Sequence, residues 1–339
     1  MFGGMGLGQM GGLGRLGQPV LGRRGDISAA YSLYLPFKNG GNYRAGSSTA
    51  SAVTGLPGYA YTGAGASGEV SQGSVTMFAA HVPKIISGAG IWLRATASSI
   101  LPRSQEFDNA SWTKTGGAIA ANAAAAPDGS MTADRLTSSG SVETAVWLGA
   151  SVTSGAVYTT SCFMERGDGH GYIQINASST AWVVFFDLTN GTVGPSVTLL
   201  GTAPAHTGYI VDLGGGKYRC IVVSNAPTTV HNPYFGVCSA VGNRSGAAGK
   251  HVYLWQAQML AGNYPSGGPI IATTTGTASI DAASLKVGMA NGNYSVTYTF
   301  DDGSTQTIPT TVAGGLFTLP VSPTALNRSL VQLVTAVPA

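Results

Sequence analysis

Side chains that could perform acid–base or covalent chemistry are few in this sequence and widely spaced. Carboxylates for glycan cleavage could come from Glu143, Glu165, Asp168 and Asp187. A glycosidase needs two such groups at a fixed separation across one bond, and the sequence does not give that separation. The chain has no GxSxG, HExxH, P-loop or CxxC motif, so we predict no catalytic residues and no enzyme activity.

Metal ligands and cofactor motifs are equally scarce. The five histidines, at positions 81, 170, 206, 231 and 251, do not have the spacing of metal ligands. Cys162, Cys220 and Cys238 are odd in number, and each lies in an apolar run. We therefore expect buried free thiols rather than disulfides, with no metal and no cofactor.

Sugar binding is a better match to the available residues. It requires an aromatic face for the apolar side of a pyranose and short polar side chains for the hydroxyls. The segment 166–172, Arg-Gly-Asp-Gly-His-Gly-Tyr, is polar, glycine-rich and aromatic at once. We predict glycan contacts from Asp168, His170 and Tyr172 in this segment, with an ordinary turn as the alternative.

A second candidate region combines Asn232 with Tyr234, which again pairs an aromatic ring with a hydrogen-bonding side chain. Trp112, Trp182 and Trp255 lie in apolar runs instead, and we expect them to pack in the core.

These residues must be positioned by β-strands. Residues 158–165 alternate with a period of two, which places Tyr158, Cys162 and Met164 on one face. Residues 182–188 are apolar on both faces and run into Asn190-Gly191, a strong hairpin signal. About eight strands without an intervening helix predict an all-β fold, with a jelly-roll β-sandwich at its centre.

Residues 101–265 also carry a family pattern, in the segments 101–114, 126–136, 214–220 and 252–260. This series resembles the jelly roll, similar to carbohydrate-binding modules, that recurs in tailed-phage fibre and spike proteins. The resemblance implies a structural virion protein, made in the bacterial host cytoplasm, that attaches to host surface polysaccharide. It also implies a homo-oligomer, most commonly a trimer.

The composition suggests five parts. They are a Gly-rich arm (1–25), an N-terminal β segment (26–100), the jelly roll (101–265), a linker (266–280) and a small C-terminal β domain (281–339). The last part has too few residues to bury much surface, so we expect it to pack on the central domain or on copies of itself.

The arm is too rich in glycine to fold alone, yet it carries regularly spaced apolar residues. This spacing favours a segment that becomes ordered on another virion protein. The candidate anchor residues are Met1, Phe2, Met5, Leu7, Met10, Leu13 and Leu16.

Charge and hydropathy argue against nucleic acids and membranes as partners. The formal net charge is +3 and only 9% of residues are charged, so we expect no nucleic-acid binding. No apolar run reaches the roughly 18 residues of a membrane helix, and no signal peptide is visible, so we expect no membrane insertion.

The leading hypothesis is therefore a tail or head fibre that contacts host glycans. One alternative is a tailspike-type enzyme that degrades polysaccharide. Another is a tail or connector component without a receptor role.

Overall fold

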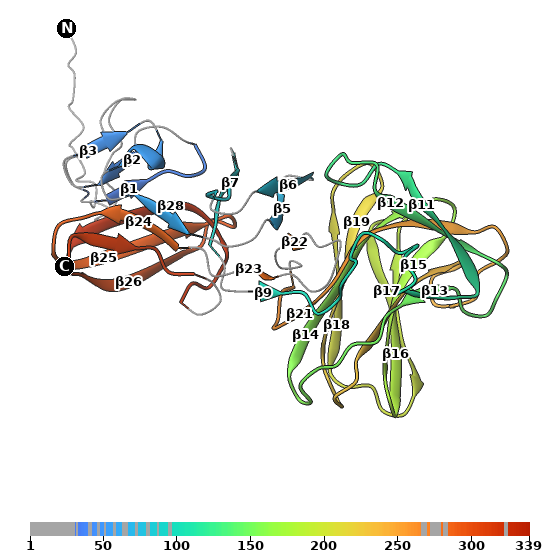
Figure 1. Ribbon diagram of the computed structural model, residues 1–339. Coiled ribbons are helices and arrows are strands. Elements are labelled where there is room, and N and C mark those ends of the chain that lie inside the picture. The colour runs from blue at the N-terminus through green and yellow to red at the C-terminus, as the bar shows by residue number, and fades with distance from the viewer. Residues whose placement is uncertain are drawn as a thin grey trace, which may run out of the picture.

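The computed structural model describes residues 31, 33–39, 43–45, 48–50, 52–56, 59–62, 67–71, 74–78, 82–86, 88–93, 97–265, 270–271, 279–280, 284–321 and 325–339. The predicted anchor in residues 1–25 lies outside this range. The described part is almost entirely β, with one 3-10 turn, η1 (Val53–Gly55), which confirms the predicted fold class. No helix in the described residues is long and apolar enough to cross a membrane. The strands form two lobes (Figure 1).

The larger lobe, here called the central domain, is a β-sandwich of two antiparallel six-stranded sheets. Sheet 1 has the spatial order β10 (Thr113–Thr115), β13 (Ala145–Trp147), β20 (Asn232–Cys238), β15 (His170–Ala177), β16 (Thr180–Asp187) and β17 (Thr192–Leu200). Sheet 2 has the order β11 (Gly117–Ala124), β12 (Ala133–Ser138), β21 (His251–Ala261), β14 (Val157–Arg166), β19 (Lys217–Asn225) and β18 (His206–Asp212).

One apolar core fills the space between these sheets. Trp182 and Phe235 of sheet 1 lie in the same buried cluster as Met164 and Val222 of sheet 2. Trp112 and Trp182 belong to this cluster, as predicted, and Trp255 is buried in a smaller one. Because side chains alternate along a strand, the residues between these core positions point to the outer face of each sheet.

The three cysteines are buried and free, as the sequence predicts. Burial raises the pKa of the Cys162 and Cys220 thiols, and it raises the pKa of Cys238 to about 12. These thiols are therefore protonated and behave as small apolar side chains.

The predicted hairpin at Asn190-Gly191 joins β16 to β17. Gly191 has a φ of 66°, the left-handed region that glycine adopts without strain, and its N–H donates to the Asp187 carbonyl over 2.9 Å. The Asp187 carboxylate accepts from the Thr189 N–H at 2.8 Å, which further fixes the turn.

The smaller lobe combines strands from both ends of the described chain. Its main sheet has the order β26 (Thr305–Val312), β25 (Gly292–Phe300), β28 (Leu330–Pro338), β1 (Leu33–Leu35), β2 (Tyr43–Ala45) and β3 (Ser48–Ala50), with β8 (Gly90–Trp92) paired to β28 and to β7 (Ile85–Ile86). A second sheet contains β27 (Leu316–Thr318), β24 (Ser284–Gly288) and β4 (Ala60–Thr62).

Short strands pair in the region between the lobes (Figure 1). They are β22 (Ile270–Ile271) with β5 (Ser67–Ser71) and β6 (Ser74–Phe78), and β23 (Ser279–Ile280) with β9 (Ala97–Ser98). The stretch predicted as a linker, 266–280, therefore contains two strands that pair with the N-terminal segment.

The C-terminal module packs on a part of the chain that the sequence analysis did not foresee. Leu33 and Leu35 of β1 share one buried cluster with Val296 and Val334 of the module. In the main sheet, Leu33 is the register partner of Ala336. The core that residues 281–339 lack by themselves thus comes from the N-terminal β segment, and the two form a single lobe.

Candidate functional site

The outer face of sheet 1 carries a row of side chains that could bind a ligand. Trp147 of β13 lies directly opposite Tyr234 of β20, and Tyr234 lies opposite Gln174 of β15. Their strand neighbours Val146, Phe235 and Ile173 point into the core. Alternation therefore directs the row to the outer face.

The two aromatic rings of this row stack on each other. Their centroids lie 4.9 Å apart with an interplanar angle of 14°, and both side chains are partly exposed. A side-chain hydrogen bond joins Tyr234 to Asn176 of β15, and burial raises the pKa of the Tyr234 phenol. The pair forms a rigid apolar surface with a neutral hydroxyl at its edge.

Polar side chains beside the rings form a connected network. The Gln174 amide donates to Asn176 Oδ1 at 3.0 Å, and its oxygen accepts from Arg244 Nη1 at 2.9 Å. The same Arg244 nitrogen lies 3.2 Å from Glu143 Oε1. Asn232 Oδ1 accepts the Ala150 N–H at 2.9 Å. Gln174 is buried, so the network fixes Asn176, Asn232 and Arg244, which are partly exposed and can exchange hydrogen bonds with a ligand.

A groove of about 250 Å³ continues from this network across sheet 1. Its lining residues come from β16, β17 and two loops: Val142, Val183, Phe185, Val197, Leu199, Gly242, Asn243, Arg244 and Ser245. We call the groove and the adjacent row Trp147, Tyr234 and Gln174 the sheet 1 site.

Two of the residues predicted in the 166–172 loop lie at the end of the β14–β15 hairpin. Asp168 is 46% exposed and its Oδ1 accepts the His251 N–H at 2.8 Å. His170 lies 3.3 Å from Asp187, between Nδ1 and Oδ1. Burial lowers the pKa of His170, and the Asp187 carboxylate partly offsets that effect. Both residues remain candidate contacts, and Lys250 Nζ lies 3.6 Å from Asp168 Oδ2.

The prediction that Tyr172 belongs to an exposed loop is wrong. The loop ends before His170, so Tyr172 is the third residue of β15, and its side chain is fully buried. The ring packs with Phe185 and Val183 beneath Val241, and its hydroxyl donates to the Thr144 carbonyl at 2.9 Å. Tyr172 therefore supports the sheet 1 site from below and cannot touch a ligand.

The other predicted pair, Asn232 and Tyr234, belongs to the sheet 1 site. The sequence analysis missed Trp147, Gln174 and Arg244. Trp147 ends a strand of three residues, which is too short for its alternation to be recognised. Gln174 interrupts the apolar run of β15 at an outward-facing position, and this polar residue was the available signal.

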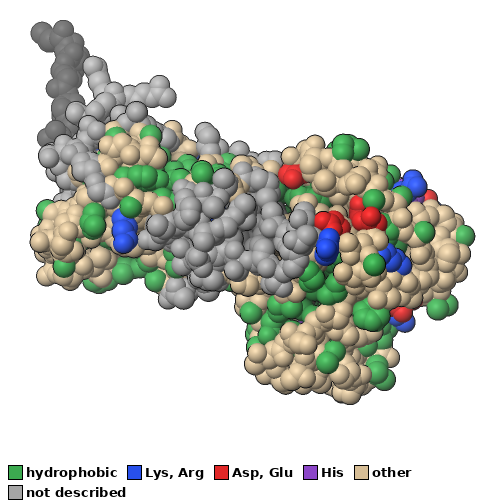
Figure 2. Space-filling model, in the orientation of Figure 1, with side chains coloured by type: hydrophobic (Ala, Val, Ile, Leu, Met, Phe, Trp, Pro, Cys, Tyr) green, Lys and Arg blue, Asp and Glu red, His purple; other side chains and the backbone are tan. Residues whose placement is uncertain are grey.

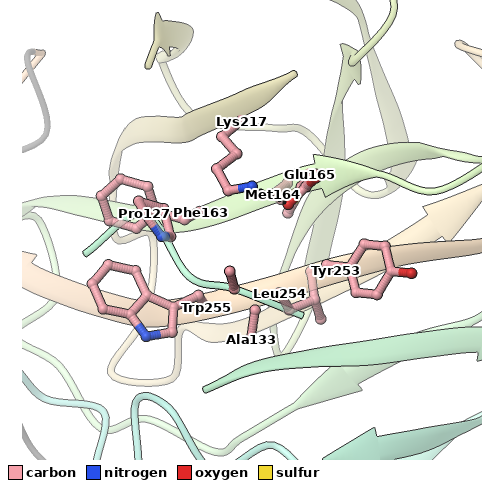
Figure 3. Close-up of a pocket in the computed structure, with 10 residues that line it drawn as sticks. Pro127, Ala133, Phe163, Met164, Glu165, Lys217, Tyr253, Leu254 and Trp255 are labelled. Atoms are coloured by element: carbon pink, nitrogen blue, oxygen red, sulfur yellow. Dashed lines mark hydrogen bonds and ion pairs between the residues drawn. The ribbon is translucent and has the colours of Figure 1, made fainter. Parts of the chain in front are cut away.

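A second pocket lies on the outer face of sheet 2, where Phe163 and Trp255 face each other beside the Lys217 and Glu165 side chains (Figure 3). Lys217 Nζ lies 2.7 Å from Glu165 Oε2, and Trp255 Nε1 donates to Thr132 Oγ1 at 3.0 Å. Its volume is about 10 Å³, comparable to the space for one water molecule. These contacts stabilise the sheet and leave no room for a sugar.

The four carboxylates considered for catalysis each have a basic partner. Glu143 pairs with Arg244, Glu165 with Lys217, Asp168 with Lys250 and His251, and Asp187 with His170. Glu143 contributes to the outer face of sheet 1, whereas Glu165 is on sheet 2. Within the described residues, no three His, Cys, Asp or Glu side chains gather as metal ligands would.

Several solved structures have a partial likeness to this chain, among them a phage tailspike domain and a xylanase. No protein-family model matches the sequence, and no curated protein matches it significantly. The enzymatically active domain of tailspike protein 4 from bacteriophage CBA120 is 14% identical, with a TM-score of 0.29, over 48% of this chain and 21% of that one. The CBM22-1 and GH10 modules of endo-1,4-β-D-xylanase 10B from Clostridium thermocellum, complexed with xylohexaose, are 10% identical with a TM-score of 0.27. That match covers 51% of this chain and 29% of the other.

Proposed function

We propose that this protein is a structural component of a tailed-phage virion, a tail or head fibre, that attaches to host surface glycans through the sheet 1 site. The observation that supports this function best is the exposed Trp147 and Tyr234 stack, which stands beside a fixed polar network and an open groove. The resemblance of residues 101–265 to phage fibre jelly rolls supports the virion role.

Sugar recognition follows from the chemistry of the site. An aromatic ring covers the C–H face of a pyranose, and amide and hydroxyl groups at its edge exchange hydrogen bonds with the sugar hydroxyls. Tyr234 and Asn176, both partly exposed, supply both components within two neighbouring strands, and the buried Gln174 holds Asn176 in place. Charged side chains are sparse on the face shown in Figure 2 and gather mainly on the central domain. A neutral polysaccharide suits such a surface.

We further propose that attachment does not involve catalysis. Glu143 lies in the loop before β13 and pairs with Arg244 beside sheet 1, whereas Glu165 is in β14 of sheet 2, so they do not flank one glycosidic bond. Asp168 Oδ1 lies 3.0 Å from His251 Nδ1, and Asp187 Oδ1 lies 3.3 Å from His170 Nδ1. A polysaccharide-degrading enzyme remains the competing proposal, and shortening of the polysaccharide during the binding assay would favour it.

Several copies of the protein that bind one surface together would raise the apparent affinity of a weak site. Linked sites that engage one surface gain about 10²- to 10⁴-fold in avidity without a new contact. A homotrimer anchored to other virion proteins by residues 1–25 would supply that arrangement, and closed rotational symmetry is the common solution for homo-oligomers.

Substitution of Trp147 by Ala tests the glycan site. We expect binding to purified host surface polysaccharide to fall by about 30-fold, the effect of losing one well-placed aromatic contact worth about 2 kcal/mol. The free energy of unfolding should fall by only about 1–2 kcal/mol, since the ring is partly exposed and loses one stacking partner. Binding is measured by surface plasmon resonance, and stability by urea denaturation.

Two further variants complete this test. Trp147→Phe keeps an aromatic face and should retain most of the binding. Asp168→Ala examines the hairpin end: a loss of binding there, with Trp147→Ala unchanged, would move the site to the Asp168 and His170 region. Full binding by both Ala variants would contradict a glycan site in either place.

Deletion of residues 1–25 tests the anchor. We expect the truncated protein to remain folded, because every described strand lies beyond residue 31. Incorporation into virions should nevertheless fail, since the apolar positions of the arm are lost. Circular dichroism checks the fold and immunoblotting of purified particles checks incorporation. Normal incorporation of the truncated protein would refute the anchoring role.

A further inference from the structure

The floor of the groove in the sheet 1 site is apolar. Val183 of β16 and Val197 of β17 are register partners, so their side chains lie together on the outer face. Val183 and Phe185 are buried at the base of the groove, so the apolar surface open to a ligand comes from Val197, Leu199 and Val142, which is 80% exposed. A ligand in the groove would therefore meet methyl groups, whereas a ligand on the neighbouring row would meet aromatic rings and amides.

The rim of the groove carries little net charge. Among its lining residues, all within the described chain, Arg244 alone is charged. Its guanidinium already donates to Gln174 Oε1 at 2.9 Å and pairs with Glu143 Oε1 at 3.2 Å. Because Glu143 offsets that charge, the groove has no surplus positive charge for an acidic sugar. Asn243 and Ser245 add neutral hydrogen-bonding groups on the same loop.

An ordinary hexose does not suit this floor. It carries a hydroxyl on nearly every carbon, and a hydroxyl placed against valine and leucine side chains loses water without gaining a partner. A methyl group in the same place would bury apolar surface instead. The volume of about 250 Å³ is slightly below the range of roughly 300–1,000 Å³ found for small-molecule sites, which suits one sugar ring with a substituent.

We infer that the groove selects a neutral sugar bearing a methyl group, either a 6-deoxyhexose or an acetylated sugar, and that this methyl rests on Val197 and Leu199. The inference rests on the proposed glycan-binding function and specifies its ligand. The ring of the next sugar along the chain would then lie against Trp147 and Tyr234, and Asn176 and Arg244, both partly exposed, would orient the hydroxyls.

Matched sugar pairs test this selection in the full-length chain. Each pair is displayed on a polymer so that weak sites are detected: L-rhamnose against L-mannose, L-fucose against L-galactose, and N-acetylglucosamine against glucose. We expect the methyl-bearing member of at least one pair to bind about tenfold more tightly, the lower end of the effect of one methyl-sized group in an apolar pocket. The first two pairs report a 6-deoxy source of the methyl and the third an acetyl source.

A valine variant with an internal control assigns the effect to the groove. Val197→Thr replaces one methyl by a hydroxyl at nearly constant volume and should abolish the preference within the pair. Val193→Thr is the control, because Val193 is on the same strand with nearly the same exposure, 39% against 38%, and does not line the groove. This control should keep the preference.

The outcomes separate this inference from the proposed function. Equal binding within every pair, or an unchanged preference in Val197→Thr, overturns the methyl selection and leaves glycan binding standing. The host polysaccharide could bind although none of the displayed sugars does. In that case, equal polysaccharide binding by Val197→Thr and the wild type overturns the methyl selection. Weaker polysaccharide binding by Val197→Thr, but not by Val193→Thr, supports it. Failure of both the displayed sugars and the host polysaccharide to bind overturns the two proposals together.

Discussion

Replacing Gly236 with Ala is expected to destabilise the central domain by about 3 kcal/mol, the upper end of the usual cost of overpacking a buried site. A Cβ at this position would lie 2.0 Å from Cζ of Tyr172, whose ring covers the glycine on the outer face of sheet 1. The ring cannot swing aside freely, because its hydroxyl is bonded to the Thr144 carbonyl and Phe185 packs beside it. Urea denaturation followed by tryptophan fluorescence measures the loss.

A double variant provides the decisive comparison for this contact. Tyr172→Ala alone should cost about 3–5 kcal/mol, as for other large buried aromatic side chains. In the Tyr172→Ala background, however, Gly236→Ala has no ring to clash with, so the double variant should be no less stable than Tyr172→Ala by itself. Tyr172→Phe, which keeps the ring, should leave the clash in place. Additive losses in the double variant would show that Gly236 is required for another reason.

Acidification should destabilise the protein through His231. This side chain is fully buried, with Nε2 at 3.2 Å from Ser224 Oγ and with the rings of Tyr158 and Trp182 beside it. Burial lowers the pKa of His231 to about 4. In the unfolded chain the pKa returns to about 6.5, so the unfolded state takes up a proton first as the pH falls.

The low pKa of His231 in the folded protein therefore contributes to stability above about pH 6.5. This contribution is lost as the pH falls toward 4, because unfolded molecules bind more protons than folded ones over this interval. The difference between the folded and unfolded pKa values of His231 corresponds to about 3 kcal/mol in the free energy of unfolding of the wild type, at roughly 1.4 kcal/mol per pKa unit. His231→Gln should have lower stability at pH 7 but a flatter profile from pH 6.5 to 4. Denaturation midpoints measured from pH 6.5 to 4 test this prediction. If the stability of the wild type and of His231→Gln changes with pH in parallel, the role of His231 is refuted.

The sandwich could be predicted because its strands carry local signals. Tyr158, Cys162 and Met164 alternate into the core of β14 as expected, and the Asn190-Gly191 turn ends β16 as expected. Pairing between distant strands leaves no such signal. Nothing local to residues 33–35 indicates that they bind β28, because any apolar strand edge of that length could do so.

In the candidate site, too, local patterns could be predicted from the sequence and contacts between distant segments could not. Asn232 and Tyr234 were predicted together as glycan contacts, and in β20 they share a face because they have equal parity in the strand. Tyr172 was misassigned because the glycines before it suggested a longer loop, whereas β15 already begins at His170. Trp147 and Arg244 could not be assigned, since their proximity to Tyr234 and Gln174 depends on how strands and loops from different parts of the chain assemble.

The position of β28 between β25 and β1 also constrains how the protein folds during synthesis. The ribosome releases β1, β2 and β3 first, but β28, the second neighbour of β1 in the sheet, is made only after the whole central domain. The central domain finds all its own partners within residues 101–265 and can fold while translation continues. The buried cluster around Leu33 and Leu35 is incomplete until β28 emerges, so these side chains remain exposed apolar surface for that interval. A pause in translation before β28 would prolong the stage at which the nascent chain is most prone to aggregate.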